Sequence, residues 1–431
     1  MKKLSIGLAV LVAASVAIVS CGGSSNSSST QHKLSGLKFR AFVSNPLFSG
    51  SPTINIVDAS QDLLSRSSIS LLGNLPQAGL MALSPDLHRT MVFSPLGNSI
   101  AVVDNTTEAL ATAPGSTSPV GTINLPGLTE SMFIAKDNVS AYAAVPTAPV
   151  TGQAPGAVVA MDIGNGLVTA TIPVVAAHYI VPSPDGTHIL VFSDGSDSLT
   201  IITTALIGSN QDPRTTVAGF DRPVWAIFSD NTTAYIFNSG PERGGTTAGI
   251  ATFTIGNSGP SAMTPVSGAT YGLLSGNNLY VAGTPFNTAC PAGTAATSCG
   301  TLNIMDATSL KVTNASPIVI TDGYHNRMQM GANGQLFIGA QGCTSINVVG
   351  GEVRGCLSIF NTSTSKVIVP TDTGDATGIQ PITGRTVVYV CEGGVFRIYD
   401  TTTDQLLVQP NGPIDIVGQS YDVKLVDPPL N

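Results

Sequence analysis

The sequence has few charged residues, only five histidines and a single tryptophan. Charged side chains make up 10% of its 431 residues, and the formal net charge is −8. An acidic surface repels the phosphate backbone, so we expect no nucleic-acid partner. The histidines are scattered, without a His-x-x-His or His-Glu-x-x-His pair, and we therefore predict no metal centre and no cofactor.

Motifs of common enzyme classes are also missing. No Gly-x-Ser-x-Gly elbow is present, and the glycine pairs at 244–245 and 350–351 lack the strand-to-helix context of a phosphate-binding loop. The segment Asp194-Gly195-Ser196-Asp197 offers oxygen ligands that could suit calcium, although acidic β-turns have the same composition. The sequence does not identify a catalytic residue.

The one long hydrophobic run lies at the N-terminus. Two lysines precede an apolar stretch over 6–19, which spans about 14 residues and is shorter than a membrane-spanning helix. The run ends in Ile18-Val19-Ser20-Cys21, which resembles the lipobox of bacterial lipoproteins. The resemblance implies that residues 1–20 are a signal peptide and that Cys21 becomes the lipid-bearing first residue of the mature protein.

Residues 21–36 are predicted to form a flexible tether. The stretch 24–30 is rich in serine and has nothing to bury. Lipoproteins retained at the inner membrane typically carry Asp where Gly22 stands, so the resemblance implies a lipid anchor in the outer membrane, on the periplasmic face or the cell surface. Because no second stretch of about 20 apolar residues follows, we expect the domain over 37–431 to be soluble, and we expect a monomer.

Glycine, proline and β-branched residues are abundant. The chain has 46 glycines and 28 prolines, and it is rich in Ser, Thr, Val and Ile, which is typical of a turn-rich all-β protein. A domain of about 395 residues exceeds a usual single hydrophobic core unless it is a closed array of repeats.

An internal repeat is present. Short alternating segments such as Thr53–Asp58 and Ser99–Asp104 end in an acidic or small polar residue that opens a turn. Asp and Asn suit this place because their side chains accept hydrogen bonds from backbone amides about two residues further on. The segments recur about every 49 residues. They end at Asp58, Asp104, Asp162, Thr203, Thr254, Asp306, Asn361 and Asp400, which makes eight copies of one unit.

Each unit contains four predicted strands, which is the composition of a β-propeller blade. A Ser-Pro-Asp-like turn, as at 84–86 and 183–185, precedes the second strand, and the segment ending in Asp is the third. Residues 37–44 look like a second strand without a first, and residues 421–427 like a first strand with nothing after it. The two ends are therefore predicted to share one blade, which closes the ring. We favour eight blades; irregular spacings from 39 to 58 residues would leave seven if one copy were an insertion.

The unit Ser183-Pro184-Asp185-Gly186, followed by an alternating strand over 188–192, resembles the YVTN-type β-propeller repeat family. Members of that family read roughly as Ser-Pro-Asp-Gly, an alternating strand, and then a strand that ends in Asp and a turn. The similarity covers nearly all of residues 37–427, although Leu190-Val191-Phe192-Ser193 stands where the family has its namesake tetrad. The resemblance implies the fold and says little about function.

Four of the five cysteines in the predicted domain lie in loops of two adjacent units. The local pairings Cys290–Cys299 and Cys343–Cys356 are favoured in an oxidising export compartment, although four cysteines allow three connectivities. Their spacings match no common zinc site. Cys391 lies in an apolar run and is predicted to be a buried thiol.

Several loops between second and third strands are long, and in propellers they share one face with the links between blades. This face is predicted to be a recognition surface. The alternative is that the loops became long by sequence drift, without a function, because the propeller fold tolerates insertions there. The long loops span residues 46–51, 146–156, 239–247, 284–300 and 340–355.

Polar and aromatic residues enter the innermost strands on the same face, beside the central channel. Arginines there suit a carboxylate, and tyrosine rings suit a stacked ligand or a sugar. A wet channel that merely tolerates polar side chains would look the same. The candidate ligand-binding residues are His178, Tyr179, Asp221, Arg222, Tyr271, Tyr324, His325, Arg327, Tyr421 and Asp422, with Glu130, Asp322 and Asn326 in the same segments.

Two functions are compatible with these observations. We favour a non-catalytic binding or scaffolding propeller on a lipid anchor, whose loop-rich face holds an envelope protein, peptide or glycan. The alternative is a periplasmic enzyme of lactonase or dehydrogenase type at the channel mouth. A lactonase would need carboxylates that converge on a metal, and the inner segments offer only some. Quinoprotein dehydrogenases often carry Trp-rich blade motifs, which are absent.

Overall fold

A computed structural model describes most of the chain after residue 32. The predicted signal peptide, Cys21 and the tether up to residue 32 lie outside the described residues. From Leu34 onwards the chain forms one compact unit. No helix in the described part is long and apolar enough to cross a membrane. The described residues are 33–46, 53–285, 290, 299–344, 346–347, 353–409 and 412–428.

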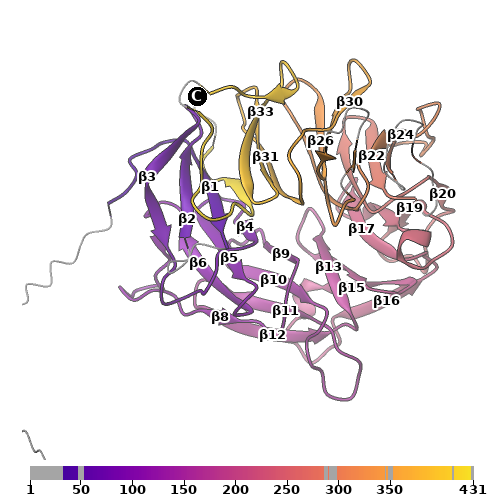
Figure 1. Ribbon diagram of the computed structural model, residues 1–431. Helices are drawn as coiled ribbons and strands as arrows, with labels where there is room; N and C mark the ends of the chain where they lie inside the picture. Colours follow the sequence, from indigo (N-terminus) through magenta and orange to yellow (C-terminus); the bar gives the residue numbers. More distant parts are fainter. Residues whose placement is uncertain are drawn as a thin grey trace, which may run out of the picture. The chain divides into compact units, whose positions relative to one another are not determined.

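Eight antiparallel blades follow one another around a ring (Figure 1). Seven are four-stranded sheets, and in one blade a short extra strand also pairs with the third strand. The all-β propeller with eight blades is thus confirmed. From the innermost strand outwards, the first four blades are β35 (Val423–Leu425), β1 (Arg40–Asn45), β2 (Thr53–Asp58), β3 (Leu63–Ser70); β4 (Met81–Leu83), β5 (Arg89–Ser94), β6 (Ser99–Asp104), β7 (Ala109–Leu110) with β8 (Ile123–Asn124); β9 (Ser131–Ile134), β10 (Ser140–Val145), β11 (Ala157–Asp162), β12 (Leu167–Pro173); and β13 (Ala177–Pro182), β14 (His188–Ser193), β15 (Ser198–Thr203), β16 (Arg214–Ala218).

The other four blades have the same order, and one of them carries an inserted hairpin. They are β17 (Pro223–Phe228), β18 (Thr233–Asn238), β19 (Gly249–Thr254), β20 (Thr264–Pro265); β21 (Tyr271–Ser275), β22 (Asn278–Gly283), β23 (Gly300–Asp306), β24 (Ile318–Ile320); β25 (Tyr324–Met330), β26 (Gln335–Gln341), β29 (Leu357–Asn361), β30 (Lys366–Ile368), with the hairpin of β27 (Ile346–Asn347) and β28 (Val353–Arg354); and β31 (Ala376–Pro381), β32 (Val387–Glu392), β33 (Val395–Asp400), β34 (Gln405–Leu406). Two short 3-10 helices, η1 (Thr204–Leu206) and η2 (Gly240–Arg243), lie in connections.

The repeated segments of the sequence are the third strands of the blades, and each ends at its predicted residue. The turn chemistry explains why. Asp58 accepts a hydrogen bond of 2.9 Å from the backbone N–H of Ser60. Asp104 accepts bonds of 2.8 and 3.0 Å from the N–H groups of Thr106 and Thr107. Such local bonds satisfy the backbone where the strand stops and fix the turn into the fourth strand.

The two ends of the chain build one blade together, as the sequence predicts. Strand β35 pairs antiparallel with β1, so that Val43 lies opposite Val423 and Ala41 opposite Leu425. The pairing removes the open edges that an unclosed ring would expose. Each of the eight repeated segments lies in a sheet of its own, so that none of the repeats is an insertion.

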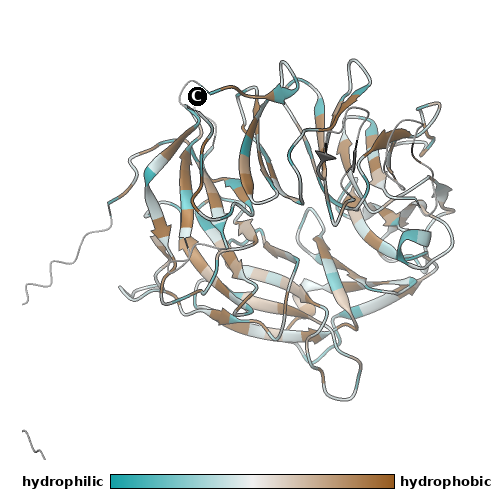
Figure 2. Ribbon diagram, viewed as in Figure 1, coloured by the Kyte–Doolittle hydropathy of each residue, from teal (hydrophilic) through white to brown (hydrophobic). Residues whose placement is uncertain are grey.

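The core lies between the blades. Eight hydrophobic clusters occur in the described part, one at each interface between neighbouring blades. The middle strands are therefore covered on both faces; β11, for example, is buried at five of its six positions. Figure 2 shows that hydrophobic residues lie along the strands. Burial of this apolar surface, at about 25 cal/mol per Å², holds the ring together.

The two predicted disulfides are present. Cys290 is bonded to Cys299 and Cys343 to Cys356, with Cα–Cα distances of 5.2 and 5.6 Å. Cys391 is a free and buried thiol, also as predicted.

The loops between second and third strands share one face with the links into the inner strands. Pro46 after β1, Pro95 after β5 and Gly393 after β32 line the same cavity as Thr129, which precedes β9, and Tyr421, which precedes β35. We call this the loop-rich face.

The N-terminal segment enters the domain from the opposite face. Strand β1 begins at Arg40 and ends beside the cavity, so Arg40 lies at the far end of a six-residue strand. Before it, the backbone N–H of Ser35 donates a hydrogen bond of 2.6 Å to Glu108, in the turn between β6 and β7. The chain that leads into the propeller therefore runs on the side away from the loop-rich face.

Candidate functional site

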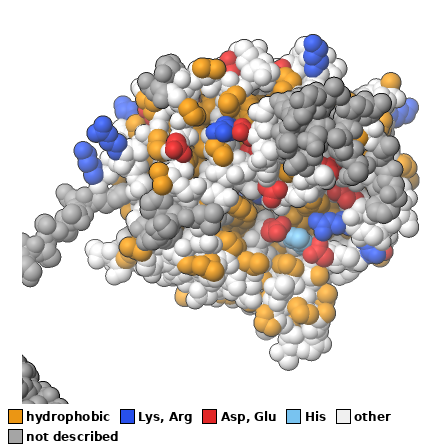
Figure 3. Space-filling view, in the orientation of Figure 1, with side chains coloured by type: hydrophobic (Ala, Val, Ile, Leu, Met, Phe, Trp, Pro, Cys, Tyr) orange, Lys and Arg blue, Asp and Glu red, His pale blue; other side chains and the backbone are white. Residues whose placement is uncertain are grey.

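A cavity of about 670 Å³ opens in the middle of the loop-rich face, and we call it the central cleft. Its size is that of a small-molecule site. Figure 3 shows acidic, basic and histidine side chains around a hollow near the middle of the molecule. The apolar side chains that line the cleft include Leu80, Phe93, Pro95 and Leu128, and the polar ones are Thr129, Glu130, Asn326, Arg327, Gln341, Asp375, Thr377, Gln419, Ser420 and Tyr421.

Irregular pairing at the start of inner strands decides which side chains reach the cleft. In β25 the register shifts between His325 and Arg327, so that Asn326 is an extra residue without a partner on β26. A bulge of this kind re-aims the side chains on either side of it. His325 points into the protein and is fully buried, whereas Arg327 lines the cleft. The same shift occurs at the start of β13, β17 and β31.

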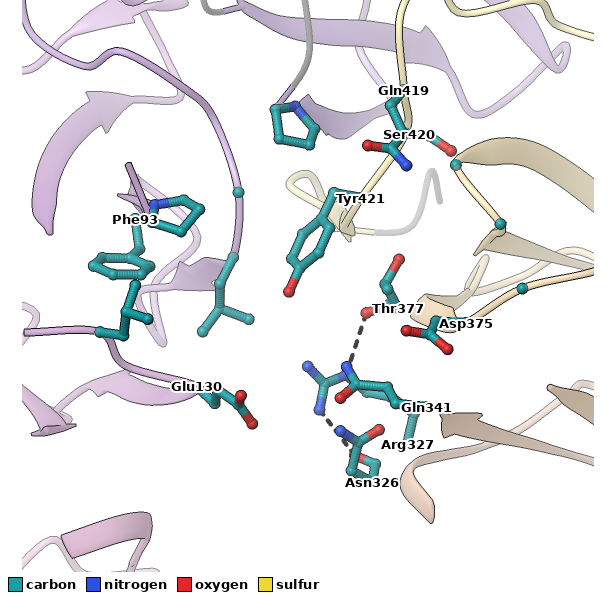
Figure 4. A pocket seen from close by; sticks show the side chains of 18 of the residues that line it. Phe93, Glu130, Asn326, Arg327, Gln341, Asp375, Thr377, Gln419, Ser420 and Tyr421 are labelled. Carbon is teal, nitrogen blue, oxygen red and sulfur yellow. Dashed lines mark hydrogen bonds between the residues drawn. The ribbon is translucent and has the colours of Figure 1, made fainter. Parts of the chain in front are cut away.

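Arg327 presents its guanidinium group to the cleft. Its Nη1 donates a hydrogen bond of 2.9 Å to the backbone oxygen of Asn326, and its Nε donates one of 3.3 Å to that of Thr377. Among the described residues no carboxylate lies within 4.0 Å of this guanidinium. Figure 4 shows the Arg327 head and the hydroxyl of Tyr421 directed towards the open middle, with Phe93 and Glu130 across from them.

Glu130, His178, Asp194 and Arg243 form an ionic group beside the cleft, which we call the His178 cluster. The Nδ1 of His178 lies 2.8 Å from Asp194, and its Nε2 lies 3.2 Å from Glu130. Arg243, on η2, lies 4.0 Å from Asp194. Burial lowers the pKa of His178, but the hydrogen bonds and charges of Asp194 and Glu130 outweigh it and raise that pKa to about 9. The imidazole is therefore a cation at neutral pH, held between two carboxylates.

Aromatic rings pack beside this cluster. Tyr179 stacks on His178 with 4.3 Å between ring centroids, and its hydroxyl donates to Glu130 over 3.2 Å. Tyr324 lies next to Tyr179, and the guanidinium of Arg243 covers its ring at 4.1 Å. Burial raises the pKa of the Tyr324 hydroxyl to about 12 and also raises that of Tyr179. Both phenols are neutral donors at physiological pH.

Tyr271 packs on Trp225, with 4.7 Å between ring centroids. Burial raises the pKa of its hydroxyl, and the charge of Arg327 opposes that rise. Of the ten predicted residues, Arg327 and Tyr421 line the cleft, His178 belongs to the His178 cluster, and Tyr179 and Tyr324 pack beside that cluster.

Four predicted residues have contacts within the protein instead. Asp221 holds the loop of residues 239–247 by accepting bonds from the backbone N–H groups at 246 and 247. Arg222 lies 3.4 Å from Asp197. His325 is fully buried and contacts the backbone oxygen of Thr321 at 3.0 Å. Asp422 is buried as well; it accepts a bond from the N–H of Met81 and pairs with Lys424 at 3.0 Å.

Both carboxylates of the 194–197 turn are directed to cations. Asp194 belongs to the His178 cluster, and Asp197 pairs with Arg222. In the part of the chain that the structure describes, no three His, Cys, Asp or Glu residues are grouped so as to hold a metal ion.

Several cleft residues were not predicted as candidates. Phe93 and Gln341 lie at the ends of the second strands β5 and β26, and Asp375 precedes the inner strand β31 as Tyr421 precedes β35. The ends of second strands and the starts of inner strands lie on the loop-rich face in every blade. Considering these positions in all blades, and not only in segments rich in Tyr and Arg, would have identified the three residues. Arg243 lies within a predicted long loop, on the short helix η2, which has Pro241 in its first turn and is followed by Gly244 in the left-handed conformation.

No protein-family model matches the sequence, and no curated protein matches it significantly. Solved structures show what the chain is similar to in space. The structure described as dihydro-heme d1 dehydrogenase NirN in complex with DHE superimposes with a TM-score of 0.60 and 14% identity, over 90% of this chain and 75% of that one. Hydrazine synthase of Kuenenia stuttgartiensis gives 0.54 and 16%, over 76% and 96%.

The Dos1 propeller gives a TM-score of 0.54 and 11% identity, over 79% of this chain and 85% of that one. At such identities the likeness shows the fold alone. The similar structures include two described as enzymes and one described only as a propeller. The protein is thus an eight-bladed β-propeller, and its function has to be argued from its own residues.

Proposed function

We propose that this protein is a lipid-anchored propeller of the cell envelope, built from YVTN-type repeats, and that it acts as a non-catalytic binding module through its loop-rich face. The observation that carries the proposal is the central cleft. It lies at the inner ends of five blades, those that begin with β35, β4, β9, β25 and β31, and its wall combines apolar side chains with amide, hydroxyl, carboxylate and guanidinium groups. Sites that bind small molecules have this mixture, in which apolar surface gives affinity and a few polar groups give orientation.

The contacts beside the cleft favour binding over catalysis. In the His178 cluster each charge is balanced by an opposite one within 4.0 Å, so His178 is held protonated and Glu130 ionised. The hydrogen bond and charge of His178 lower the pKa of Glu130. A base poised near neutral pH would serve proton transfer better. The cluster instead stiffens one wall of the cleft.

The direction in which the chain enters the propeller suits an anchor at Cys21. Residues from Leu34 to Phe39 lead into β1 on the side away from the loop-rich face. A lipid on Cys21 would then leave the central cleft directed away from the membrane. The tether of residues 21–36 would hold the domain off the surface, and the two disulfides suit an oxidising envelope compartment.

The proposal is tested by ligand capture. The full-length protein in lipid nanodiscs is incubated with the small molecules, peptides and glycans of an envelope extract, and retained compounds are identified by mass spectrometry. Leu128→Trp, at a half-exposed cleft residue, should prevent retention, while Leu167→Trp, on the exposed strand β12, should not. Retention that is equal in both variants, or absent from the wild type, would contradict the proposal.

The same experiment addresses the alternative of a lactonase or dehydrogenase. A binding module returns its ligand unchanged, whereas an enzyme converts it. Appearance of a hydrolysed or oxidised product with wild type, but not with Leu128→Trp, would replace the binding function by the enzymatic one. Lipid anchoring is tested separately by Cys21→Ser, which should release the protein into the soluble fraction, and separation of the two membranes on a density gradient tests the outer-membrane location of the wild type.

A further inference from the structure

Three charged residues line the central cleft, and they differ in the polar contacts that they make with the rest of the protein. Glu130 is within 3.2 Å of both His178 and the hydroxyl of Tyr179. Asp375 accepts a hydrogen bond of 2.8 Å from the backbone N–H of Gly342. The hydrogen bonds of Arg327 within the described residues go to two backbone oxygens, which are neutral, and its charge acts on Glu130, whose pKa it helps to lower, only from beyond ion-pair distance. Its positive charge is therefore the one in the cleft without an opposite charge at ion-pair distance, within the described part of the protein.

The guanidinium group of Arg327 also has donors to spare. It carries five N–H groups, of which one on Nε and one on Nη1 bind the carbonyl oxygens. Three remain, one on Nη1 and two on Nη2. Parallel N–H groups of this kind match the two oxygens of a carboxylate, and such bidentate bonds are stronger than bonds between neutral groups. Figure 4 shows this head directed into open space beside the Tyr421 hydroxyl, a neutral donor because burial raises its pKa.

The opposite wall of the cleft carries apolar side chains beside Glu130. Leu80, Phe93, Pro95 and Leu128 line it, and the Leu128 side chain remains 53% exposed. Phe93 lies across the cleft from Arg327 (Figure 4). A ligand that fills the cleft thus meets a cation at one end and hydrocarbon at the other.

We propose that the central cleft binds a small monocarboxylate with an apolar body, with the carboxylate on Arg327 and the body against Leu80, Pro95 and Leu128. This inference rests on the proposed binding function and names its ligand class. A second negative charge on the ligand would meet Glu130 and Asp375, which is why one carboxylate is specified. A cationic ligand would be attracted by those carboxylates but repelled by Arg327.

Three probes with the same body and different charge test the inference. They are 3-phenylpropionate, 3-phenylpropanamide and 3-phenylpropylamine, titrated by isothermal calorimetry into full-length protein in nanodiscs, with empty nanodiscs as the blank. Wild type should bind the acid at least ten-fold more tightly than the amide, and bind the amine least. Arg327→Gln should weaken the acid at least ten-fold and leave the amide within two-fold. Arg214→Gln, at an arginine outside the cleft, should change neither.

A second variant guards against a loss of structure in Arg327→Gln. Leu128→Asp places a negative charge at an exposed cleft position and should weaken the acid while strengthening the amine. Thermal unfolding checks that each variant folds. Equal affinity for acid and amide, tightest binding of the amine, or no binding of any probe would overturn the carboxylate inference. The capture experiment with Leu128→Trp would still decide whether the cleft binds something else, so the two failures are distinguishable.

Discussion

Arg40 and Asp427 lie 387 residues apart in the sequence and form an ion pair, with 2.6 Å between Nη2 and Oδ1. The same guanidinium group donates a bond of 2.8 Å from Nη1 to Glu108, in the next blade. Arg40 therefore joins both ends of the chain to each other and to a neighbouring blade. All three side chains are largely buried, so the pair acts in a medium where an unpaired charge is strongly disfavoured.

We expect Arg40→Met to lower the free energy of unfolding by about 3 kcal/mol, because it leaves two buried carboxylates without their cation. Guanidinium-induced unfolding followed by circular dichroism measures the change. Arg214→Gln breaks the exposed pair with Asp212 and should change the free energy of unfolding much less than Arg40→Met does. Equal effects of the two substitutions would mean that the closure does not depend on Arg40.

The cysteines give a second prediction, which a thiol count can check. With Cys21 replaced by Ser, the folded protein should not react with a thiol reagent, since Cys391 is buried and burial raises the pKa of its thiol. Denaturation without reductant should expose one thiol per chain, and with reductant five. Cys343→Ser together with Cys356→Ser should destabilise the protein by about 2 to 3 kcal/mol. Three thiols without reductant would contradict the two disulfides.

Most of the fold could be predicted from the sequence because its signals are local. The end of each third strand is set by a side chain that bonds to the turn beginning there, as Asp104 does with Thr106. Ring closure followed from counting strands in the incomplete units at 37–44 and 421–427. Neither inference needed knowledge of which residues meet in space.

The site could be predicted only in part, because it depends on bulges. Tyr324, His325 and Arg327 are almost consecutive, and all three were predicted to face a ligand. The extra residue at Asn326 sends His325 into the core and Arg327 into the cleft. A shift of one residue reverses which face a side chain occupies, and no sequence pattern announces it.

The two environments of histidine give a third prediction. We expect His178 to titrate with a pKa of about 9 and His325 with a pKa of about 4, since burial lowers the latter. NMR titration of protein labelled at histidine, with His178→Gln for assignment, measures both. Asp194→Asn should bring the pKa of His178 back towards 6.5. A titration of His178 at or below its ordinary value would show that the cluster does not hold the imidazolium.

The sign of the effect on stability follows from the direction of the shift. His178 binds its proton more tightly in the folded protein, so its contribution is fully present below pH 6.5 and is lost as the pH rises through 9. We expect His178 to contribute about 2 kcal/mol to the free energy of unfolding. This is less than the full pKa shift would give, because Glu130 and Asp194 are half exposed and solvent screens their charges. The difference in unfolding free energy between wild type and His178→Gln should therefore shrink between pH 6.5 and pH 9.

Glu392 also has a raised pKa, but replacing it should stabilise the protein near neutral pH, whereas replacing His178 should destabilise it. It is the last residue of β32 and is fully buried against the segment at Gly355, where the backbone N–H of Leu357 and the hydroxyl of Tyr399 lower its pKa less than burial raises it. Burial raises its pKa to about 8. The folded protein therefore keeps this proton up to pH 8, while the unfolded chain releases it near pH 4.5. The contribution of the protonated Glu392 to the free energy of unfolding is complete below pH 4.5 and declines as the pH rises to 8.

Glu392→Gln replaces the acid by a neutral side chain of the same shape and removes that dependence. We expect the variant to match wild type near pH 5 and to be more stable by about 2 to 3 kcal/mol at pH 8 and above. Unfolding curves at half-unit pH steps measure the difference, with Glu242→Gln as a comparison at another carboxyl whose pKa burial raises to about 8. A variant less stable than wild type at pH 8 would mean that the Glu392 carboxylate is ionised and has a favourable partner, because only a charged group that is stabilised in the fold would be missed at that pH.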